Sequence, residues 1–240
     1  MKKSINEAMI FAAGFGKRML PITDKIPKPL VKINDKSLLL HQIEKLLELK
    51  FKNIVVNAFH LADRIVKEVK PFNPKVRVIV ENEILETGGG LLNAIDNDFF
   101  LRSNKPKVLI NGDIFWIDKD YLTLDSLIHN WSEKKMDILL CLKPKNDFFG
   151  YYGNGDFDLK NSKSKVSKIL KINNCSDYTF TGLQIINPKV LHKFKKKKFS
   201  IREIFFSLID KGRIYGFIDN NPWYHISNPR DLNKINLLLK

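Results

Sequence analysis

The chain has 240 residues, of which 44% are hydrophobic and 11% aromatic, and this composition excludes a disordered protein. A chain of this length can bury the core of one large domain, residues 1–240. No apolar stretch approaches the ~20 residues of a membrane span, and the apolar run near the N-terminus is too short for a signal peptide. Cys141 and Cys175 give neither a disulfide framework nor a metal cluster. We therefore expect a cytoplasmic protein with no membrane partner.

The formal net charge of +15 is compatible with a nucleic acid, an acidic membrane surface or small anionic substrates. Lysines are spread through almost every segment, which indicates a general compositional bias. The one dense run, residues 195–198, has no interleaved aromatic residues and matches no nucleic-acid-binding motif. We therefore expect no nucleic-acid partner.

The first predicted element is an apolar strand, residues 8–13, which leads into a glycine-rich turn. The turn contains Gly14 and Gly16, and Lys17 and Arg18 follow at once. Glycine lets the backbone approach an anion closely and adopt positive φ, so such a turn can present N–H groups to a phosphate. An ordinary strand followed by a basic surface turn is the alternative interpretation of the glycines alone.

Two common phosphate-binding motifs are absent from this turn. A Walker A loop needs Ser or Thr where this chain has Arg18, and a dinucleotide fingerprint needs a third glycine where it has Met19. Residues 27–29, Pro-Lys-Pro, follow the turn, and their prolines are expected to keep Lys28 out of a helix. A long cation on a stiff extended segment is suited to reaching a polyphosphate.

Strands and helices alternate through the first half of the chain. Apolar residues at helical spacing predict helices over residues 37–49 and 63–69, and short apolar runs predict strands over residues 53–57 and 76–80. A strand at 107–110, a helix at 124–134 and a strand at 138–142 follow. This alternation favours parallel βαβ units with right-handed crossovers, in an α/β sheet of the nucleotide-binding type.

Two polar segments flank predicted strands in this half. Residues 83–90 end in three glycines before a helix predicted from about residue 91 to 96, so a flat or anionic ligand could lie against backbone amides there. A flexible loop is the alternative. Residues 111–113, Asn-Gly-Asp, follow a strand, where ligands and metals gather in open α/β sheets. Asp113 there could bind a magnesium ion that also bridges phosphates, or be a simple turn residue.

The pattern changes after Gly150. Turn residues and short strands predict an antiparallel excursion as far as Ile186. An amphipathic helix over residues 200–211 and a strand over residues 214–218 follow.

The segment Ala12-Ala13-Gly14-x-Gly16-x-Arg18-Met19-x-Pro21-x-Thr23, together with residues 27–29, resembles the signature of the sugar-1-phosphate nucleotidyltransferases. Those enzymes join a sugar 1-phosphate to a nucleoside triphosphate, and these two are the partners the resemblance implies. The resemblance extends from Ala8 to about Leu232. The implied fold is a Rossmann-like mixed α/β sheet flanked by helices, the nucleotide-diphospho-sugar transferase (GT-A-like) fold, with a small antiparallel excursion. Residues from about 8 to 145 would bind the nucleotide, and those from about 146 to 232 the sugar and metal.

The resemblance also implies residue roles. Arg18, Lys28 and Asp113 would be catalytic, with Asp113 a metal ligand. The implied nucleotide-binding residues are Ala13, Gly14, Gly16, Lys17, Arg18, Lys28 and Gly88, with Gly88 at the base. The implied sugar-phosphate-binding residues are Asn111, Gly155, Asp156, Thr181 and Gly182. The Glu-Lys-Pro segment that holds the sugar phosphate in many relatives has no clear counterpart, and Lys168 and Lys171 are candidate substitutes.

Residues 85–90 resemble the base-recognition loop of one subgroup, the N-acetylmuramate 1-phosphate uridylyltransferases and similar mannose- and heptose-phosphate enzymes. This favours UTP and N-acetylmuramate 1-phosphate as substrates, in cell-wall recycling. A guanylyltransferase acting on mannose or heptose 1-phosphate is the second hypothesis.

Residues 222–232 resemble the closing motif of the family, Trp-x-Asp-x-Gly-Thr-Pro-x-Asp-Leu, with departures. His225 stands where the second metal-binding aspartate is usual, and Ser227 and Asn228 replace Gly-Thr. Mg²⁺ is the expected cofactor, but an imidazole ligand would favour Mn²⁺. His225 could instead bond to a phosphate. A non-catalytic nucleotide-sugar sensor is the hypothesis from a different class.

Overall fold

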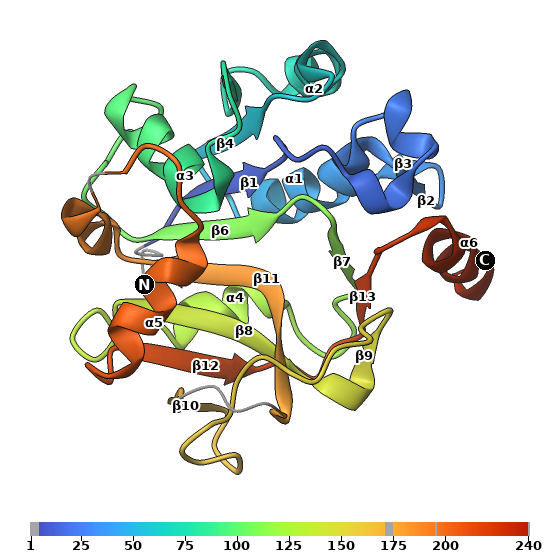
Figure 1. Cartoon of the computed structure of the whole chain (residues 1–240). Coiled ribbons are helices and arrows are strands. Elements are labelled where there is room, and N and C mark those ends of the chain that lie inside the picture. The colour runs from blue at the N-terminus through green and yellow to red at the C-terminus, as the bar shows by residue number, and fades with distance from the viewer. Residues whose placement is uncertain (1–4, 171–174, 195, 240) are drawn as a thin grey trace.

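The computed structural model describes residues 5–170, 175–194 and 196–239, so Lys171 lies outside the described residues. Its centre is an eight-stranded sheet (Figure 1). The strands are β1 (Glu7–Phe11), β4 (Asn53–Ala58), β5 (Val76–Val80), β6 (Lys107–Asn111), β8 (Ile138–Pro144), β10 (Val166–Lys168), β11 (Tyr178–Ile186) and β12 (Ile214–Ile218). Their order across the sheet is β10-β12-β8-β11-β6-β1-β4-β5.

The sheet is mixed, as predicted. β1 pairs in parallel with β4 and β6, and β4 pairs in parallel with β5, which gives the nucleotide-binding type of sheet. β11 runs antiparallel to β6 and β8, whereas β12 is parallel to β8. The antiparallel strand β11 therefore joins the two predicted halves in one sheet. The division of labour between those halves stays a prediction.

Helices cover both faces of the sheet. One face packs against α1 (Leu38–Glu48), α2 (Ala62–Val69) and α4 (Thr123–His129). The other face packs against α3 (Glu86–Asp96) and α5 (Ile201–Ile209). Because successive side chains of a strand point to opposite faces, Ala8 and Ile10 of β1 enter the first core and Met9 the second.

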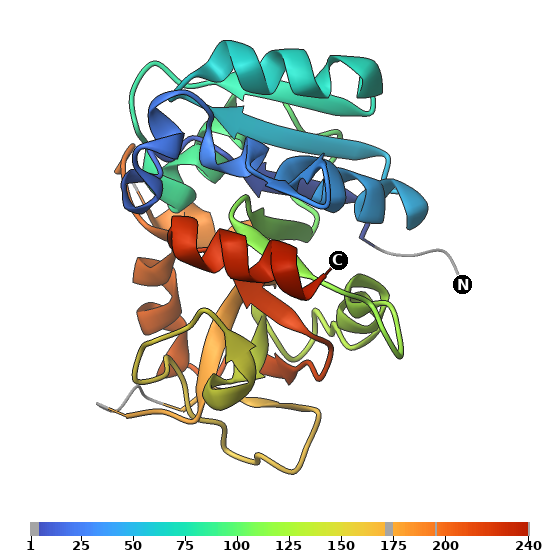
Figure 2. The same ribbon diagram turned by 90° about the vertical axis from the view of Figure 1, so that its right-hand side faces the viewer.

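Smaller elements surround the sheet. β7 (Ile114–Trp116), β13 (Trp223–His225) and β9 (Phe148–Phe149) form a three-stranded sheet, and β2 (Lys32–Ile33) pairs with β3 (Lys36–Ser37). The helix α6 (Pro229–Leu238) packs against β2. It is the red helix at the front of the molecule in Figure 2, next to the C-terminus. Short 3₁₀ helices are η1 (Lys17–Met19), η2 (Ile22–Asp24), η3 (Lys28–Leu30), η4 (Lys70–Phe72), η5 (Lys145–Asp147) and η6 (Pro188–Lys193). No helix in the described ranges is long and apolar enough to cross a membrane.

The prediction for the three glycines was wrong in one respect. The helix α3 begins at Glu86, so these glycines lie inside its first turns instead of preceding it. A Cβ on Gly88 would lie 2.3 Å from Cε2 of Phe199, and one on Gly89 would lie 2.2 Å from the carbonyl oxygen of Lys197. The glycines are therefore required because another segment packs closely against this side of the helix.

Two other predictions need correction. The helix α4 ends at His129 instead of residue 134, because Asn130 at its C-terminus donates a side-chain hydrogen bond to the carbonyl of Ser126 (2.8 Å). Lys28 does not lie on an extended segment, since it opens the 3₁₀ turn η3. Pro29 fits there because a first helical turn does not need its missing N–H.

Candidate active site

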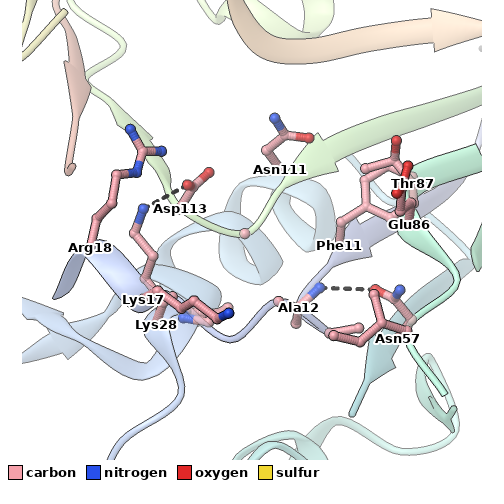
Figure 3. A pocket seen from close by; sticks show the side chains of 16 residues that line it. Phe11, Ala12, Lys17, Arg18, Lys28, Asn57, Glu86, Thr87, Asn111 and Asp113 are labelled. Carbon is pink, nitrogen blue, oxygen red and sulfur yellow. Dashed lines mark hydrogen bonds and ion pairs between the residues drawn. The ribbon is translucent and has the colours of Figure 1, made fainter. Parts of the chain in front are cut away.

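A cavity of about 400 Å³ opens where β1, β4 and β6 reach their carboxyl ends. Its wall is made by the glycine-rich turn after β1, the start of α3 and the turn after β6. Arg18, Lys28 and Asp113 gather at one end of it, and Asn57, Glu86 and Thr87 line the other (Figure 3). Of the predicted nucleotide-binding residues, the lining includes Ala13, Gly14, Gly16, Lys17, Arg18 and Lys28. The structure thus brings most of them to one cavity.

The two glycines of the turn differ in what they require. Gly16 has φ +64°, and a Cβ there would lie 2.9 Å from Cγ2 of Thr23 and 3.0 Å from Cβ of Lys28. The Thr23 hydroxyl donates a hydrogen bond to the Gly16 carbonyl (3.0 Å), which fixes this conformation. A Cβ on Gly14 would meet no atom within 4 Å, because Gly14 faces the open cavity. Gly16 therefore shapes the turn, whereas Gly14 keeps space for a ligand.

This difference predicts opposite effects of two alanine substitutions. Gly16→Ala should lower the free energy of unfolding by about 1–2 kcal/mol, because alanine resists the left-handed conformation. That loss corresponds to a fall in Tm of roughly 2–8 °C. Gly14→Ala should leave Tm unchanged and raise the KM for the nucleotide, since its methyl group enters the cavity. Thermal unfolding and steady-state kinetics of both variants test this, and a lower Tm for Gly14→Ala alone would contradict it.

The catalytic residues predicted from the sequence meet at one point. Nζ of Lys28 lies 2.7 Å from Oδ2 of Asp113, although 85 positions separate them in the chain. The Lys28 side chain is 8% exposed and that of Asp113 is 28% exposed. Burial disfavours the charged form of Asp113, but its charged neighbours, chiefly Lys28, hold the pKa of its carboxyl below the ordinary 3.8. Asp113 is therefore ionised at neutral pH.

Sequence reasoning missed a polar network at the other end of the cavity. Asn57, at the end of β4, accepts a hydrogen bond from the backbone N–H of Ala12 (2.9 Å) and donates one to Glu81 (2.8 Å). A Cβ on Gly90 would lie 2.9 Å from both side chains, which explains that glycine. Burial raises the pKa of Glu81. Polar residues at strand ends, within an otherwise apolar strand pattern, were the available signal.

Comparison with known families identifies the family to which the chain belongs. The profile of the nucleotidyl transferase family matches residues 7–240. The chain belongs to the nucleotidyl transferase family. As a member of it, the protein is a sugar-1-phosphate nucleotidyltransferase, which releases pyrophosphate, and the fold and activity expected from the sequence are confirmed.

Individual relatives of this nucleotidyltransferase agree with that membership. It is 27% identical over 236 residues to the N-acetylmuramate alpha-1-phosphate uridylyltransferase of Caulobacter vibrioides, covering 96% of this chain and 95% of that protein. It is 26% identical to the mannose-1-phosphate guanyltransferase of Schizosaccharomyces pombe over 94% of this chain, but spans only 62% of that longer protein. The crystal structure of HddC from Yersinia pseudotuberculosis with GMP-PN has 25% identity and a TM-score of 0.74, over 98% of this chain and 100% of that one.

The predicted sugar-phosphate residues of the nucleotidyltransferase divide into two groups. Asn111 lines the cavity. Gly182 (φ +93°) lies against the side chain of Asn111, since a Cβ on Gly182 would be 2.9 Å from Nδ2 of Asn111. Thr181 is buried and donates to the Cys141 carbonyl (3.0 Å).

The other members of this set lie apart from the cavity lining. Asp156 accepts hydrogen bonds from the Thr179 hydroxyl (2.6 Å) and the Phe180 N–H (3.0 Å), which ties its loop to β11. Gly155 (φ +88°) packs against the carbonyl of Ser176. Lys168 lies on the edge strand β10. Their role in sugar binding stays a prediction, as does that of Gly88, which packs behind Glu86 and Thr87 against Phe199.

His225 lies close to Asp113 in this nucleotidyltransferase. β13 pairs with β7 so that His225 is opposite Ile114, the residue after Asp113. Burial lowers the pKa of His225 below the ordinary 6.5, and Lys28 and Arg18 act in the same direction while Asp113 opposes them. The imidazole is therefore neutral at pH 7, the form that binds metals. Among the described residues no group of three or more His, Cys, Asp or Glu side chains could hold a metal.

A divalent metal fits this donor set. Mg²⁺ is commonly held by one or two carboxylates, and substrate phosphates complete its ligands. Asp113 supplies an ionised carboxylate that is partly exposed at the cavity, next to the cations that would face those phosphates. The site therefore suits a metal that arrives with the nucleotide.

Proposed function

We propose that this enzyme transfers a uridylyl group from UTP to N-acetylmuramate 1-phosphate. The observation that carries this choice is the relative from Caulobacter vibrioides, which bears that activity in its name and matches this chain over 95% of its own length. The mannose-1-phosphate guanylyltransferases match over only 60–62% of theirs. Such a reaction consumes a nucleoside triphosphate of the cytoplasm and serves cell-wall recycling, so we also propose a cytoplasmic location.

The reaction requires positioning and charge neutralisation more than covalent chemistry. A phosphate oxygen of the sugar 1-phosphate attacks the α-phosphorus in line, one P–O bond forms, and the bond to the leaving pyrophosphate breaks. Lys28 and Arg18 bind the triphosphate and offset its developing charge, while the turn at Gly14 and Gly16 presents backbone N–H groups. Asp113 keeps Lys28 in place and would hold the metal. When bound, the metal neutralises phosphate charge.

Pyrophosphate release tests the proposed substrates. Purified protein is assayed with UTP or GTP against a panel of sugar 1-phosphates that includes N-acetylmuramate, mannose and heptose 1-phosphate. Turnover with UTP and N-acetylmuramate 1-phosphate is expected. Turnover only with GTP would establish the guanylyltransferase alternative, which the likeness to the GMP-PN complex of HddC favours. Release from no pair, with nucleotide binding intact, would favour the sensor.

His225 leads to a prediction about the metal. Since a neutral imidazole is a better ligand for Mn²⁺ than for Mg²⁺, we expect Mn²⁺ to support turnover at least about 10-fold better at limiting metal. His225→Asp should reverse the preference, because a second carboxylate suits Mg²⁺. Metal titrations of wild type and variant, at fixed nucleotide, measure this. Equal support by both metals in both proteins would place His225 off the metal, bonded to a phosphate instead.

A further inference from the structure

Gln42 is a buried polar residue that neither the predicted site nor the proposed mechanism uses. It lies on the buried face of α1, among Leu38, Leu39, Ile43 and Leu46, and is 1% exposed. At this spacing along the helix, an apolar side chain would be the ordinary choice. A buried amide costs free energy unless its hydrogen bonds are made, so its partners show what it does.

The amide of Gln42 bridges the turn that carries Asp113. Nε2 donates to the carbonyl oxygens of Asn111 and Ile114, at 2.9 Å each. Asn111 ends β6 of the large sheet, and Ile114 begins β7 of the small one. One nitrogen therefore holds both ends of the segment from Asn111 to Ile114, whose side chains Asn111 and Asp113 reach the cavity (Figure 3).

The orientation of this amide follows from chemistry. The reversed orientation would place Oε1 against two carbonyl oxygens, which are also acceptors, so Nε2 must face them. Oε1 is buried and has no hydrogen-bond partner among the described residues. One acceptor atom of Gln42 is thus left without a hydrogen bond, whereas two buried backbone carbonyl groups each receive one.

Other contacts fix the turn and the helix, so the bridge has a defined geometry. The Gly112 N–H donates to the Phe11 carbonyl (2.9 Å), and a Cβ on Gly112 would lie 2.5 Å from that oxygen. One helical turn after Gln42, Lys45 forms an ion pair with Asp118, just beyond β7. The same helix α1 also packs against η3, which carries Lys28. α1 therefore supports both partners of the Lys28–Asp113 pair.

We propose that Gln42 is a positioning residue that orients Asp113, and with it Asn111, through the two carbonyl groups it binds. The proposal rests on the role proposed for Asp113. A shift of about 1 Å in a reacting group can cost ~10²-fold in rate, and residues behind a metal ligand typically change metal affinity 10- to 100-fold. Gln42 thus matters for chemistry although it does not line the cavity.

Gln42→Met tests the proposal, because methionine keeps the length of the side chain and removes both donated bonds. We expect kcat to fall by about 10- to 100-fold and the affinity for Mn²⁺ to fall by about 10-fold, with the nucleotide KM nearly unchanged. Mn²⁺ binding is measured without turnover, by water-proton relaxation. The assays use the best nucleotide and sugar phosphate of the panel, so they do not depend on the identity of the base.

Asn53→Leu is the matched control. The buried amide of Asn53 also donates two bonds, to Glu7 (3.1 Å) and to the Phe99 carbonyl (2.7 Å), but at the opposite end of the sheet. It should lower Tm about as much as Gln42→Met and leave kcat and Mn²⁺ affinity unchanged. The proposal is overturned if Gln42→Met lowers Tm but leaves kcat and Mn²⁺ affinity at their wild-type values, or if both variants lower kcat equally. Gln42 would then have only a structural role.

Two further variants make the result decisive. If Gln42→Met does not fold, the shorter amide in Gln42→Asn is assayed, and wild-type kcat and Mn²⁺ affinity in that folded variant would overturn the proposal. Asp113→Asn separates this inference from the proposed function. Normal activity of Asp113→Asn would refute the role of Asp113 itself. Loss in Asp113→Asn with normal Gln42→Met would refute only the inference about Gln42.

Discussion

Replacing Lys28 by alanine should lower kcat by ~10²–10³ while the protein stays folded, since this is the usual loss when one preorganised charged group is removed. Lys28 is almost buried, it lines the cavity, and its ammonium group is held by Asp113 at 2.7 Å. No water-exposed lysine could offset phosphate charge as effectively, because the surroundings of Lys28 screen it less. Steady-state kinetics of the variant measure kcat, and circular dichroism shows whether the variant is folded.

Lys28→Met separates charge from packing, because methionine retains most of the buried stem. We expect it to be as inactive as Lys28→Ala and more stable. Without Lys28 the pKa of Asp113 should rise, since that cation is the chief influence holding it down. A lowered pKa of Asp113 in the folded protein stabilises the fold at pH values above the pKa of an unfolded aspartate. This stabilisation is lost as the pH falls through the folded-state pKa, so the stability difference between wild type and variant should shrink in acid. Near-normal turnover of either variant would refute the site.

Asp113→Ala should also lose most turnover, by ~10²–10³, for a different reason. Asp113 supplies the ionised carboxylate at the cavity and the partner that keeps Lys28 oriented. Its loss should therefore weaken metal binding as well as the rate. Asp113→Asn keeps the shape and removes the charge, and it should behave like Asp113→Ala. Pyrophosphate release and Mn²⁺ binding in both variants provide the measurement.

The double variant Lys28→Ala/Asp113→Ala shows whether the two residues act together. If they form one unit, removing both should cost little more than removing either, and the free-energy losses will not add. Gln184→Met controls for the general effect of replacing a buried polar side chain, because Gln184 is a buried glutamine of β11 that does not line the cavity. Additive losses for the double variant would mean that Lys28 and Asp113 contribute independently.

The sequence alone predicted the local elements well, because their patterns are local. Apolar spacing placed α1 and α5 within a few residues of their observed bounds, and in the structure the side chains of Ser37 and Ser200 cap the two helices. The error at residues 88–90 has a physical cause, since three consecutive glycines look like a loop by propensity. Only the close packing of Phe199 and Lys197, from a distant segment, makes them helical.

The family and the set of charged residues could be assigned from the amino-acid sequence, because the turn from Gly14 to Arg18, together with Lys28 and Asp113, forms motifs that do not depend on knowing any contact. The arrangement of these residues in space became visible only in the folded chain. Folding paired Lys28 with Asp113, placed His225 beside them through β13, and set Gln42 beneath their turn. Hydrogen bonds and close ion pairs act over only a few ångströms. Residues that are distant in the chain come within that range only when the sheet forms, so their pairing cannot be read from local patterns.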